Sequence, residues 1–493
     1  MGSASVLHEQ REARLDVTEE GRRQRHAKAR AEHWDGVARD VRRRGRTGRY
    51  YHQRLAEIYR HLVAPHLRVL ELGCADGDLL AALEPAVGVG VDFSEEMLRE
   101  ARARHPDLTF VNQNVDDLRL DGPFDVVILS DLMNDLWDVQ GALERIRPLC
   151  TPTTRLLINS YSRLWELPLA AAARLGLARP TLRQNWLTAE DIENLLRLTG
   201  FEPLRRSQEI LWPIWTPVLA WFSNAVLVKL WPLRHLALAN VFVARLQAAP
   251  RYDPPPLVSV IVPARNEAGN MADIFTRTPE MGAGTEIIVV EGHSRDDTYA
   301  AVERAIAEHP ERRCKLLRQA GIGKGDAVRA GFAAASGDVL MILDADLTVP
   351  PEGLPRFYEA LVSGRGEFIN GVRLVYPMDD RAMRFLNLLA NRFFSIAFSW
   401  LLGQPIKDTL CGTKALSRHD YRRIAANRAY FGDFDPFGDF DLIFGAARQN
   451  LKLTDLPIRY RERTYGTTNI QRFRDGLLLL RMVVFAATRI KFV

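Results

Sequence analysis

Val69–Asp78 reads VLELGCADGD and combines an apolar run, a turn of small residues and the start of a helical pattern. The turn that begins at Gly73 lets the backbone approach a ligand closely, because glycine has no Cβ atom. The next apolar run, Val87–Val91, ends in Asp92, nineteen residues after Gly73. An acid at the tip of a second strand can accept hydrogen bonds from both hydroxyls of a ribose. The stretch therefore predicts a strand, a turn and a helix at a nucleoside-binding edge.

Short β-rich runs alternate with helical patterns around this stretch, as far as about Arg245. Such alternation is typical of a parallel sheet with crossover helices. Gln247–Pro256 (QAAPRYDPPP) interrupts it, because its prolines sustain neither a helix nor a central strand. The strand candidates are Val69–Leu72, Val87–Val91, Phe124–Leu129 and Arg155–Asn159, followed after the prolines by Val258–Val262, Glu286–Val290, Lys315–Leu317, Val339–Leu343 and Glu367–Asn370.

These patterns predict an α/β protein with two doubly wound domains. We expect a basic N-terminal arm over 1–48, a first domain over 49–246, a proline-rich linker over 247–256, a second domain over 257–470 and a basic amphipathic helix over 471–493. The 493 residues are 47% hydrophobic and 26% charged, which argues against a disordered chain, a collagen-like repeat and a multi-span membrane protein.

Charge and cysteine usage narrow the class further. The four cysteines are widely spaced and form no C-x-x-C pair, so we expect neither a disulfide scaffold nor a zinc ribbon. Such cysteine usage is typical of a protein in the reducing cytoplasm. The N-terminus has no apolar signal-peptide core. The net charge of +5 does not by itself define a nucleic-acid binder. Basic residues gather at the ends: thirteen Lys or Arg against eight Asp or Glu in residues 1–50, and eight against two in residues 459–493.

The first domain resembles class I S-adenosylmethionine-dependent methyltransferases over about 48–205. The resemblance rests on the glycine turn, on FDVVILSDLMND (Phe124–Asp135) and on NWLTAEDIENLL (Asn185–Leu196). It implies S-adenosylmethionine as cofactor, held by Glu71 before the turn, by the turn itself, by Asp92 on the ribose and by a segment near the adenine. The turn residues are Gly73, Ala75 and Gly77, and the adenine segment holds Asn114 and Val115. Ala75 and Asn114 depart from the usual glycine and acid.

Two other interpretations of the first domain stay open. A nicotinamide-binding Rossmann domain would share the fold, but its pyrophosphate-binding G-x-G-x-x-G is absent, whereas Glu71 suits a cationic sulfonium cofactor. The second alternative is a domain that has lost its catalytic role and serves only as structure.

Acids also follow neighbouring strands of the second domain. Val258–Glu267 reads VSVIVPARNE, the strand over Glu286–Val290 ends in Glu291, and the strand over Val339–Leu343 ends in Asp344-Ala-Asp346. Ligands bind at the carboxyl ends of strands in open α/β sheets. Two carboxylates in a D-x-D pair can hold Mg²⁺ or Mn²⁺ against a diphosphate, because these ions prefer oxygen ligands shared with substrate phosphates.

This order of motifs resembles family 2 glycosyltransferases of the GT-A fold, close to dolichol-phosphate mannose synthases, over about 257–470. The resemblance implies a nucleotide pocket lined by Pro263, Arg265, Glu267 and Glu291. It places Lys324 and Asp326 near the donor, and Asp344 and Asp346 on the metal. The sequence Glu291-Gly-His departs from the family's usual Asp-Asp-Gly, so the nucleotide base is not predicted.

The same resemblance assigns an acceptor side. Arg373 and Arg384 match positions near an acceptor phosphate, and Arg463 matches the arginine of an R-x-x-G element near the phosphates. Asp408, Asp439 and Asp441 are candidates for orienting the acceptor or, for a sugar hydroxyl, for taking its proton.

Two segments predict contact with an anionic membrane surface. At 100° per residue, Arg381–Leu402 separates a stripe of Arg381, Arg384, Arg392, Ser395 and Ser399 from one of Leu386, Leu389, Phe393, Ile396 and Trp400. The tail places Arg474, Arg481 and Arg489 on one side, opposite Leu479, Val483 and Ile490. Packing of either helix against the protein's own core is the alternative. A third run, Ile210–Val228, holds two prolines and three tryptophans and is expected to be interfacial or inter-domain rather than spanning.

The sequence thus predicts inverting, metal-dependent transfer of a sugar from a nucleotide sugar to a polyprenyl phosphate, fused to a methyltransferase of unknown acceptor. We expect a peripheral protein on the inner, cytoplasmic face of the cell membrane. The alternatives are a glycosyltransferase acting on a sugar hydroxyl with a silent docking domain, and a nucleic-acid methyltransferase. The last lacks a recognised RNA-binding module, so no nucleic-acid partner is expected. The oligomeric state is not predicted.

Overall fold

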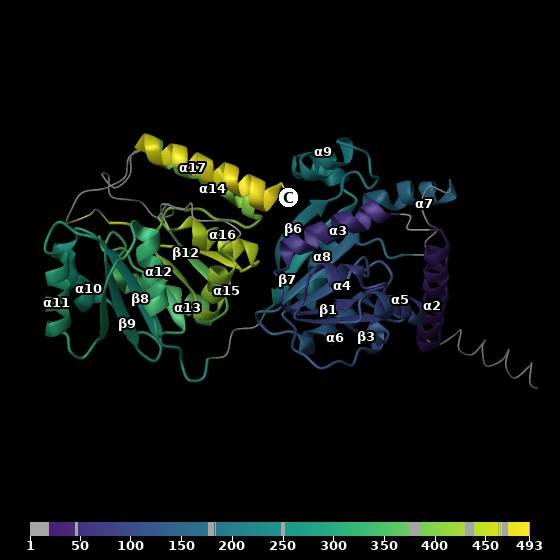
Figure 1. Ribbon diagram of the computed structural model, residues 1–493, viewed down its shortest axis with the longest axis horizontal. Helices are drawn as coiled ribbons and strands as arrows, with labels where there is room; N and C mark the ends of the chain where they lie inside the picture. Colours follow the sequence, from purple (N-terminus) through teal and green to yellow (C-terminus); the bar gives the residue numbers. More distant parts are fainter. Residues whose placement is uncertain are drawn as a thin grey trace, which may run out of the picture. The chain divides into compact units, whose positions relative to one another are not determined.

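The computed structural model describes residues 19–44, 48–175, 182, 184–247, 252–373, 385–428, 438–461, 463, 465 and 472–492. The chain forms two compact units, Met1–Gln247 and Ala248–Val493, each built around its own sheet (Figure 1). The division falls at the start of the proline-rich segment 247–256.

Unit 1 contains, within its described residues, a seven-stranded sheet in the order β3-β2-β1-β4-β5-β7-β6. The first five strands in this order are parallel, and β7 runs antiparallel to both β5 and β6. The chain moves outward from β1 in both directions, which creates a switch point beside the carboxyl ends of β1 and β4. The strands are β1 (Arg68–Leu72), β2 (Val87–Asp92), β3 (Thr109–Asn112), β4 (Val126–Ser130), β5 (Arg155–Tyr161), β6 (Phe201–Glu209) and β7 (Ala239–Leu246).

Both faces of this sheet are covered by helices, as the prediction of a doubly wound domain requires. Alternate residues of β1 enter different cores: Val69 packs in one buried cluster, and Leu70 and Leu72 in the other. The prediction of a Rossmann-like first domain is therefore confirmed. The helices are α2 (Glu19–Arg44), α3 (Arg49–Leu62), α4 (Asp78–Ala82), α5 (Glu95–Arg104), α6 (Val139–Ile146), α7 (Glu166–Arg174), α8 (Ala189–Leu198) and α9 (Leu219–Ala225).

The basic N-terminal arm is docked on unit 1 along α2. Arg23 pairs with Asp117 at 2.6 Å, and Arg30 pairs with Asp135 at 3.3 Å. The Ser94 hydroxyl donates to Asp35 at 2.5 Å. Two basic residues of this arm therefore form ion pairs with acids of its own domain, and α2 packs as part of unit 1.

Unit 2 repeats the central arrangement with a different outer half. Its described sheet has the order β10-β9-β8-β11-β13-β12-β14. The strands β10, β9, β8 and β11 are parallel, whereas β13 runs antiparallel to β11 and β12. The strands are β8 (Val258–Ala264), β9 (Thr285–Glu291), β10 (Arg313–Arg318), β11 (Val339–Ile342), β12 (Phe368–Val372), β13 (Lys414–Ser417) and β14 (Leu453–Pro457).

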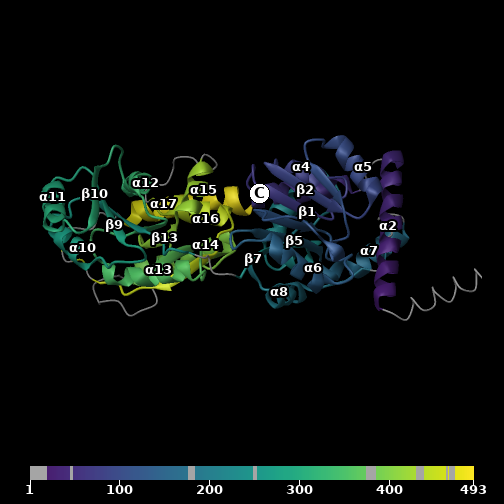
Figure 2. The ribbon, with the colours of Figure 1, turned by 90° about the horizontal axis from the view of Figure 1, so that it is seen from below.

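Helices cover both faces of the second sheet as well, with a buried cluster on each side. They are α10 (Met271–Arg277), α11 (Thr298–Glu308), α12 (Lys324–Ala334), α13 (Leu354–Val362), α14 (Phe385–Leu402), α15 (Arg418–Ala426), α16 (Phe440–Arg448) and α17 (Arg472–Ala486). The helices α14 and α17 lie side by side and pack on one of these clusters (Figure 2).

The packing of α14 and α17 corrects the predicted helix faces. On α14, Ser395 and Ser399 donate to the Ile406 carbonyl oxygen, so this part of the expected polar stripe faces the protein. On the tail, Leu479 and Ile490 are buried in the core rather than offered to a membrane. Arg381 and Arg384 lie outside the described residues, as do the side chains of Arg474, Leu386 and Leu389. Within the described part of the chain, no helix combines the length and the hydropathy needed to cross a bilayer.

Candidate functional site

The glycine turn of unit 1 has the backbone conformation that its sequence predicts. Gly73, Ala75 and Gly77 all have positive φ, at 72°, 46° and 73°. A Cβ atom at Gly77 would lie 2.7 Å from the Phe110 ring, so this glycine is required by space as well as by conformation. Ala75 takes the left-handed conformation despite its side chain, at a cost of roughly 1–2 kcal/mol. The departure from glycine at this position is therefore accommodated in the turn.

Asp92 fastens the turn to the end of β2. Its Oδ2 accepts a hydrogen bond from the Ala75 amide at 3.0 Å, and its Oδ1 accepts one from the Ser94 amide at 2.8 Å. Burial raises the pKa of Asp92 to about 6, with these hydrogen bonds offsetting part of the effect. A carboxylate offers about four acceptor positions, so Asp92 retains capacity for ribose hydroxyls.

Glu71 is buried one residue before the end of β1. No donor among the described residues reaches its Oε2 atom. Burial raises the pKa of Glu71 well above its usual range, and the neighbouring Asp76 adds to the effect. A cationic ligand would relieve this cost, because an opposite charge favours the ionised carboxylate. The residues present therefore fit a sulfonium cofactor.

The two residues assigned to the adenine have separate local roles. The Asn114 side chain caps a short 3₁₀ turn by accepting from the Asp116 amide at 3.0 Å. The Val115 side chain is buried in the core of unit 1.

Sequence reasoning missed Asp131, which follows β4 directly. This residue has a positive φ of 54°, and its carboxylate accepts hydrogen bonds from Tyr51 and Asn159. Its position in FDVVILSDLMND, at the carboxyl end of the fourth strand, was the available signal. The partners could not be found in this way, because Tyr51 lies 80 residues earlier in the chain.

In unit 2, the nucleotide-pocket candidates meet at the ends of β8 and β9. Pro263 pairs with Val290 and Ala264 with Glu291, so these strand ends are level. Glu291 is buried and accepts from the Ser294 amide at 2.5 Å, whereas the side chain of Arg265 is exposed.

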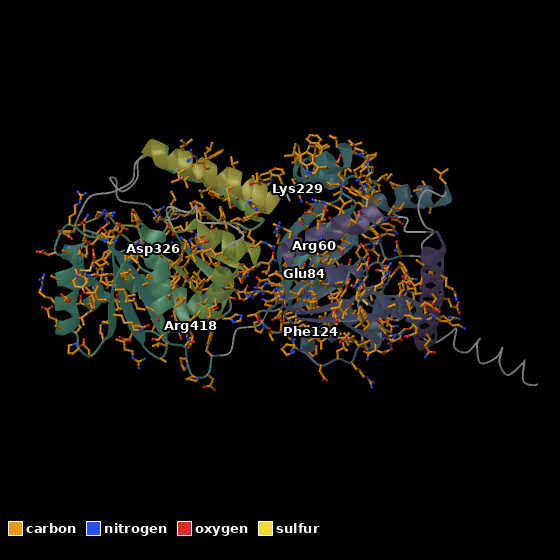
Figure 3. The ribbon with its side chains drawn as sticks, viewed as in Figure 1. Arg60, Glu84, Phe124, Lys229, Asp326 and Arg418 are labelled. Carbon is orange, nitrogen blue, oxygen red and sulfur yellow. The ribbon has the colours of Figure 1, made fainter. Side chains whose placement is uncertain are left out.

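Asp326 lies at the start of α12 and holds the preceding loop (Figure 3). Its Oδ2 accepts from the Gly321 amide at 2.9 Å and from Gln319 Nε2 at 3.0 Å. Asp326 therefore shapes the loop that presents Lys324.

Lys324 and Asp344 form an ion pair at 2.6 Å. Burial alone would raise the pKa of Asp344, but the Lys324 ammonium outweighs it and keeps this pKa below its ordinary value. A side chain at Gly412 would collide with both groups. The glycine of the segment CGTK therefore allows backbone to lie directly against this pair.

Arg463 bridges the second aspartate of the D-x-D pair and the acid that follows β8. It contacts Asp346 at 2.6 Å and Glu267 at 3.1 Å. Burial raises the pKa of Glu267 to about 7, and Arg463 offsets part of the effect. Three residues expected around the diphosphate are thus brought together.

Each acceptor-side candidate in the described residues is paired with an opposite charge. Arg373 forms a bidentate ion pair with Asp408, with Nε 2.7 Å from Oδ2 and Nη2 2.9 Å from Oδ1. Asp439 pairs with the buried Lys414 at 3.0 Å. Asp441 instead pairs with Arg428 at 3.1 Å, beside α15. Arg384 lies outside the described residues.

The structure connects these pairs into a network around Asp344. The charges of Lys324, Lys414 and Arg373 all act on this carboxylate, and Asp439 acts on Lys324. Gly438, before α16, packs against Gly325 in α12 so closely that neither tolerates a side chain. Asp408 and Asp439 therefore belong to the same site as the D-x-D pair, whereas Asp441 faces away toward α15.

No group of three or more His, Cys, Asp or Glu side chains in the described residues is arranged to hold a metal ion alone. Asp344 and Asp346 are occupied by Lys324 and Arg463. Two carboxylates are nevertheless a sufficient protein contribution for Mg²⁺, which usually keeps waters and takes substrate phosphates as ligands. The donor set fits a metal that arrives with a nucleoside diphosphate.

Comparison with protein families agrees with both halves of this description. The family described as "Methyltransferase domain" matches residues 42–205, and "Glycosyl transferase family 2" matches residues 259–424. The chain therefore carries a methyltransferase domain followed by a family 2 glycosyltransferase domain. The prediction of this fusion is confirmed.

Curated relatives match the second domain. Glycosyltransferase AglJ of Haloferax volcanii is 29% identical over 224 residues, which are 45% of this chain and 69% of that protein. Dolichol-phosphate mannosyltransferase of Pyrococcus furiosus is 37% identical over 109 residues, 22% of this chain and 30% of that one. Undecaprenyl-phosphate 4-deoxy-4-formamido-L-arabinose transferase of Pseudomonas aeruginosa is 27% identical over 236 residues, 47% and 66%. The chain thus spans between 30% and 69% of these proteins.

Two solved structures are similar to parts of the chain. A Haloferax volcanii methyltransferase in complex with the Trm112 activator is 21% identical, with a TM-score of 0.34, and the match covers 43% of this chain and 97% of that one. Glucosyl-3-phosphoglycerate synthase of Mycobacterium tuberculosis is 22% identical, with a TM-score of 0.35 and coverage of 48% and 81%.

Proposed function

We propose that unit 2 transfers a sugar, with inversion, from a nucleotide-sugar donor to a polyprenyl phosphate. The observation that carries the proposal is the cluster of acid–cation pairs at the carboxyl edge of its sheet, with Asp344, Asp346 and Arg373 in one network. Transfer to dolichol or undecaprenyl phosphate in the names of the relatives supports the class of acceptor.

The charge states of the site favour a phosphate acceptor over a sugar hydroxyl. A phosphate monoester has a second pKa of about 6 and is already anionic at neutral pH, so it needs no strong base. Burial alone would raise the pKa of Asp408, but Arg373 reverses the effect and holds this pKa low. Asp408 is thus a weak base, and its role is to orient Arg373 toward the acceptor. Catalysis then depends on positioning and on charge stabilisation.

Asp344 and Asp346 are the proposed metal ligands. When bound, Mg²⁺ or Mn²⁺ would stabilise charge on the departing nucleoside diphosphate. Lys324 and Arg463, which pair with these aspartates in the structure, provide further positive charge for the phosphates. Glu267, Glu291, Pro263 and Arg265 line the nucleotide side, and Asp326 holds the loop of Lys324.

Mass spectrometry of lipid products tests the proposal. The full chain is incubated with undecaprenyl phosphate in vesicles, Mn²⁺ and a panel of nucleotide sugars. We expect one donor to give a new glycolipid, and expect both chelation and Asp346→Asn to remove it. A product formed on a soluble sugar instead would support the hydroxyl-acceptor alternative, with Asp439 as its base.

For unit 1 we propose binding of S-adenosylmethionine and transfer of its methyl group. The buried Glu71 carboxylate, whose Oε2 has no donor among the described residues, is the supporting observation. Isothermal titration of the full chain with S-adenosylmethionine separates this proposal from a silent docking domain. Loss of binding in Glu71→Gln, with binding retained in the exposed Asp107→Asn, would support it.

We further propose that the protein is peripheral on the cytoplasmic face of the cell membrane. On α14, Phe393 and Ile396 are 57% and 66% exposed although the opposite side of the helix is buried. On α17, Leu477, Leu480 and Val484 are exposed beside Arg481. Exposed apolar residues next to basic ones suit an anionic lipid surface.

Unit 1 offers a second apolar surface, in the segment 210–236 between β6 and β7. Trp215, Trp221 and Trp231 are 66%, 66% and 76% exposed, and the segment contains no Asp or Glu. Lys229 is tied to the buried Glu209, while the apolar side chains around α9 project from the unit (Figure 3). Tryptophan is enriched at membrane–water interfaces, which supports lipid as the occupant.

A further inference from the structure

A cavity of about 70 Å³, continuous with open solvent, lies at the carboxyl edge of the sheet in unit 1. A space of this size admits a few water-sized groups, such as a hydroxyl of a larger ligand that lies mostly outside it. The cavity is lined from α2, from the segment after β4, from β5 and from the segment before α8, by His33, Trp34, Asp131, Asp135, Tyr161 and Gln184.

The cavity adjoins the cofactor turn. β1 and β4 are paired in parallel, with Leu72 opposite Leu129, so Gly73 and Asp131 follow neighbouring strand ends. A Cβ atom at Gly73 would lie 3.0 Å from the side chain of Leu132, the residue next to Asp131. A ligand in the cavity and a ligand on the turn therefore occupy adjacent places.

Asp131 is held in a fixed orientation at this junction. The Tyr51 hydroxyl lies 2.9 and 3.0 Å from its two oxygens, and Asn159 Nδ2 donates to Oδ1 at 2.5 Å. Its positive φ of 54° is uncommon for a residue with a side chain, and such conformations cluster at functional sites. A carboxylate offers about four acceptor positions, so Asp131 can accept one more hydrogen bond beside those from Tyr51, Asn159 and Tyr161.

The groups around Asp131 leave it near neutrality as a proton acceptor. Burial raises the pKa of Asp131 to about 7, hydrogen bonds from Tyr51 and Asn159 offset part of this rise, and Asp135 adds to it. The groups that face it are Tyr51 and Tyr59 from α3, Asn159 and Tyr161 from β5, Asp135 after β4, and Arg30 and His33 from α2. A base works best when its pKa lies close to the working pH.

We propose that Asp131 is the general base of the methyl transfer and that the acceptor in the cavity is a hydroxyl group of a carbohydrate. The inference rests on the proposed function of unit 1. In the step, the hydroxyl proton passes to a carboxylate oxygen of Asp131, and a lone pair of the acceptor oxygen forms the new O–C bond. The C–S bond of the cofactor breaks, and sulfur keeps its electron pair, giving a methyl ether and S-adenosylhomocysteine.

The charge and the lining residues of the cavity favour this class of acceptor. Arg30 neutralises Asp135, contacting its carboxylate at 3.3 Å and its carbonyl oxygen at 2.8 Å. The cavity therefore lacks the doubled negative charge that would recruit a cationic amine. A neutral alcohol requires a base, which Asp131 provides. Trp34 and Tyr161 give apolar ring surfaces, while Asp135 and Gln184 give polar partners for further hydroxyls.

The test uses the full chain with S-adenosylmethionine and a panel of p-nitrophenyl hexopyranosides, with phenethylamine as the amine probe. We expect a methyl ether on a hexopyranoside. Asp131→Asn should lower its rate at least about 10²-fold, the lower range of general-base catalysis, while cofactor affinity stays within about twofold. The wild-type rate should rise with pH through about 7, because ionised Asp131 is the active form, and Asp131→Asn should lose this rise.

A second measurement does not depend on turnover. In the ¹³C NMR spectrum of the aspartate-labelled chain, one carboxyl resonance should titrate near pH 7, be absent in Asp131→Asn and shift when the methylated hexopyranoside is added. Trp34→Ala should raise KM with little change in kcat, and the exposed Asp107→Asn is the matched control.

The outcomes separate the inference from the proposed function. Methylation of the amine alone, or an Asp131→Asn chain with wild-type rate and pH profile, would overturn the inference and leave the methyltransferase proposal standing. A wild-type chain that binds cofactor but methylates no hexopyranoside would overturn the carbohydrate acceptor. Failure to bind S-adenosylmethionine would overturn the proposed function itself.

Discussion

The two units share one central arrangement of strands, yet the acids at its carboxyl edge are compensated differently. In the described part of unit 1, Glu71, Asp92 and Asp131 pair with no Lys or Arg, and burial raises the pKa of each. In unit 2, Asp344 and Asp408 keep low pKa values because Lys324 and Arg373 sit against them. This difference supports the two proposals: a cationic ligand in unit 1, and in unit 2 a ligand that brings its own phosphates and metal.

The largest expected effect breaks the pairing in unit 2. Asp344→Asn should lower sugar transfer by at least about 10³-fold, because it removes a proposed metal ligand and the partner of Lys324, the proposed diphosphate-binding cation. It should also destabilise the fold by about 1–3 kcal/mol, since Lys324 loses its closest counter-charge in a partly exposed pair. Chemical denaturation measures the second effect.

Asp346→Asn is the matched variant. Arg463, the partner of Asp346, still forms an ion pair with Glu267 in this variant. Sugar transfer should therefore fall with little change in the free energy of unfolding. Equal loss of stability in both variants would contradict the expected difference between Asp344 and Asp346. Full sugar transfer in the presence of a chelator would show that no metal ion is required.

The next prediction tests whether unit 1 binds the cationic cofactor. Asp92→Ala should weaken S-adenosylmethionine binding by about 1–3 kcal/mol, the cost of stranding hydrogen-bonded polar groups. Part of the loss should come from the released Ala75 amide, which Asp92 holds at 3.0 Å. Titration calorimetry measures the affinity, with Asp107→Asn as control. Unchanged affinity would place the cofactor elsewhere.

Vesicle binding distinguishes the two apolar surfaces. Changing Arg481 and Arg489 to Glu should weaken co-sedimentation with anionic vesicles by at least about 2 kcal/mol, at ~1 kcal/mol for each lost cation near the lipid, because the new carboxylates are also repelled. Added salt should mimic this variant, because surface charges are screened. Changing Trp215, Trp221 and Trp231 to Ser should weaken binding without altering its salt dependence. If neither set affects co-sedimentation, the proposed membrane contact is wrong.

The smallest effect is a pH dependence in unit 1. Asp92 has a pKa of about 6, so acidification through this value neutralises it and weakens cofactor binding. Between pH 7.5 and pH 5 the affinity should fall about tenfold, the change in the ionised fraction of such a group. Binding at pH 7 should also release protons, because a cation beside Glu71 lowers its raised pKa. Calorimetry in buffers of different ionisation enthalpy detects this release, and Glu71→Gln should abolish it.

The positions where strands end could be predicted from the sequence alone, and with them most residues of both candidate sites. Asp92, Glu291 and Asp344 follow apolar runs directly, and the carboxyl ends of parallel strands necessarily meet. Their partners depend on contacts across the chain that no local pattern encodes. Arg463 reaches Glu267 over 196 positions, and Arg30 reaches Asp135 over 105.

The buried and exposed sides of the amphipathic helices could not be predicted, for a different reason. Periodicity indicates that a helix has an apolar side, but a protein core and a bilayer select the same residues. Leu479 and Ile490 were therefore assigned to lipid although they pack in the core of unit 2. The exposed apolar residues on α14 and α17 became recognisable only once the buried side was known.

The order of the last two strands in unit 1 sets a limit on how the methyltransferase domain can be isolated. The family match ends at residue 205, inside β6, and omits β7, which pairs with β5 along seven residues. A fragment cut there would leave β5 as a bare edge with unpaired amides and carbonyls, a template for aggregation. Starting it at residue 42 would also discard Arg30, His33 and Trp34. A fragment that retains 19–247 keeps both the sheet edge and the cavity wall intact.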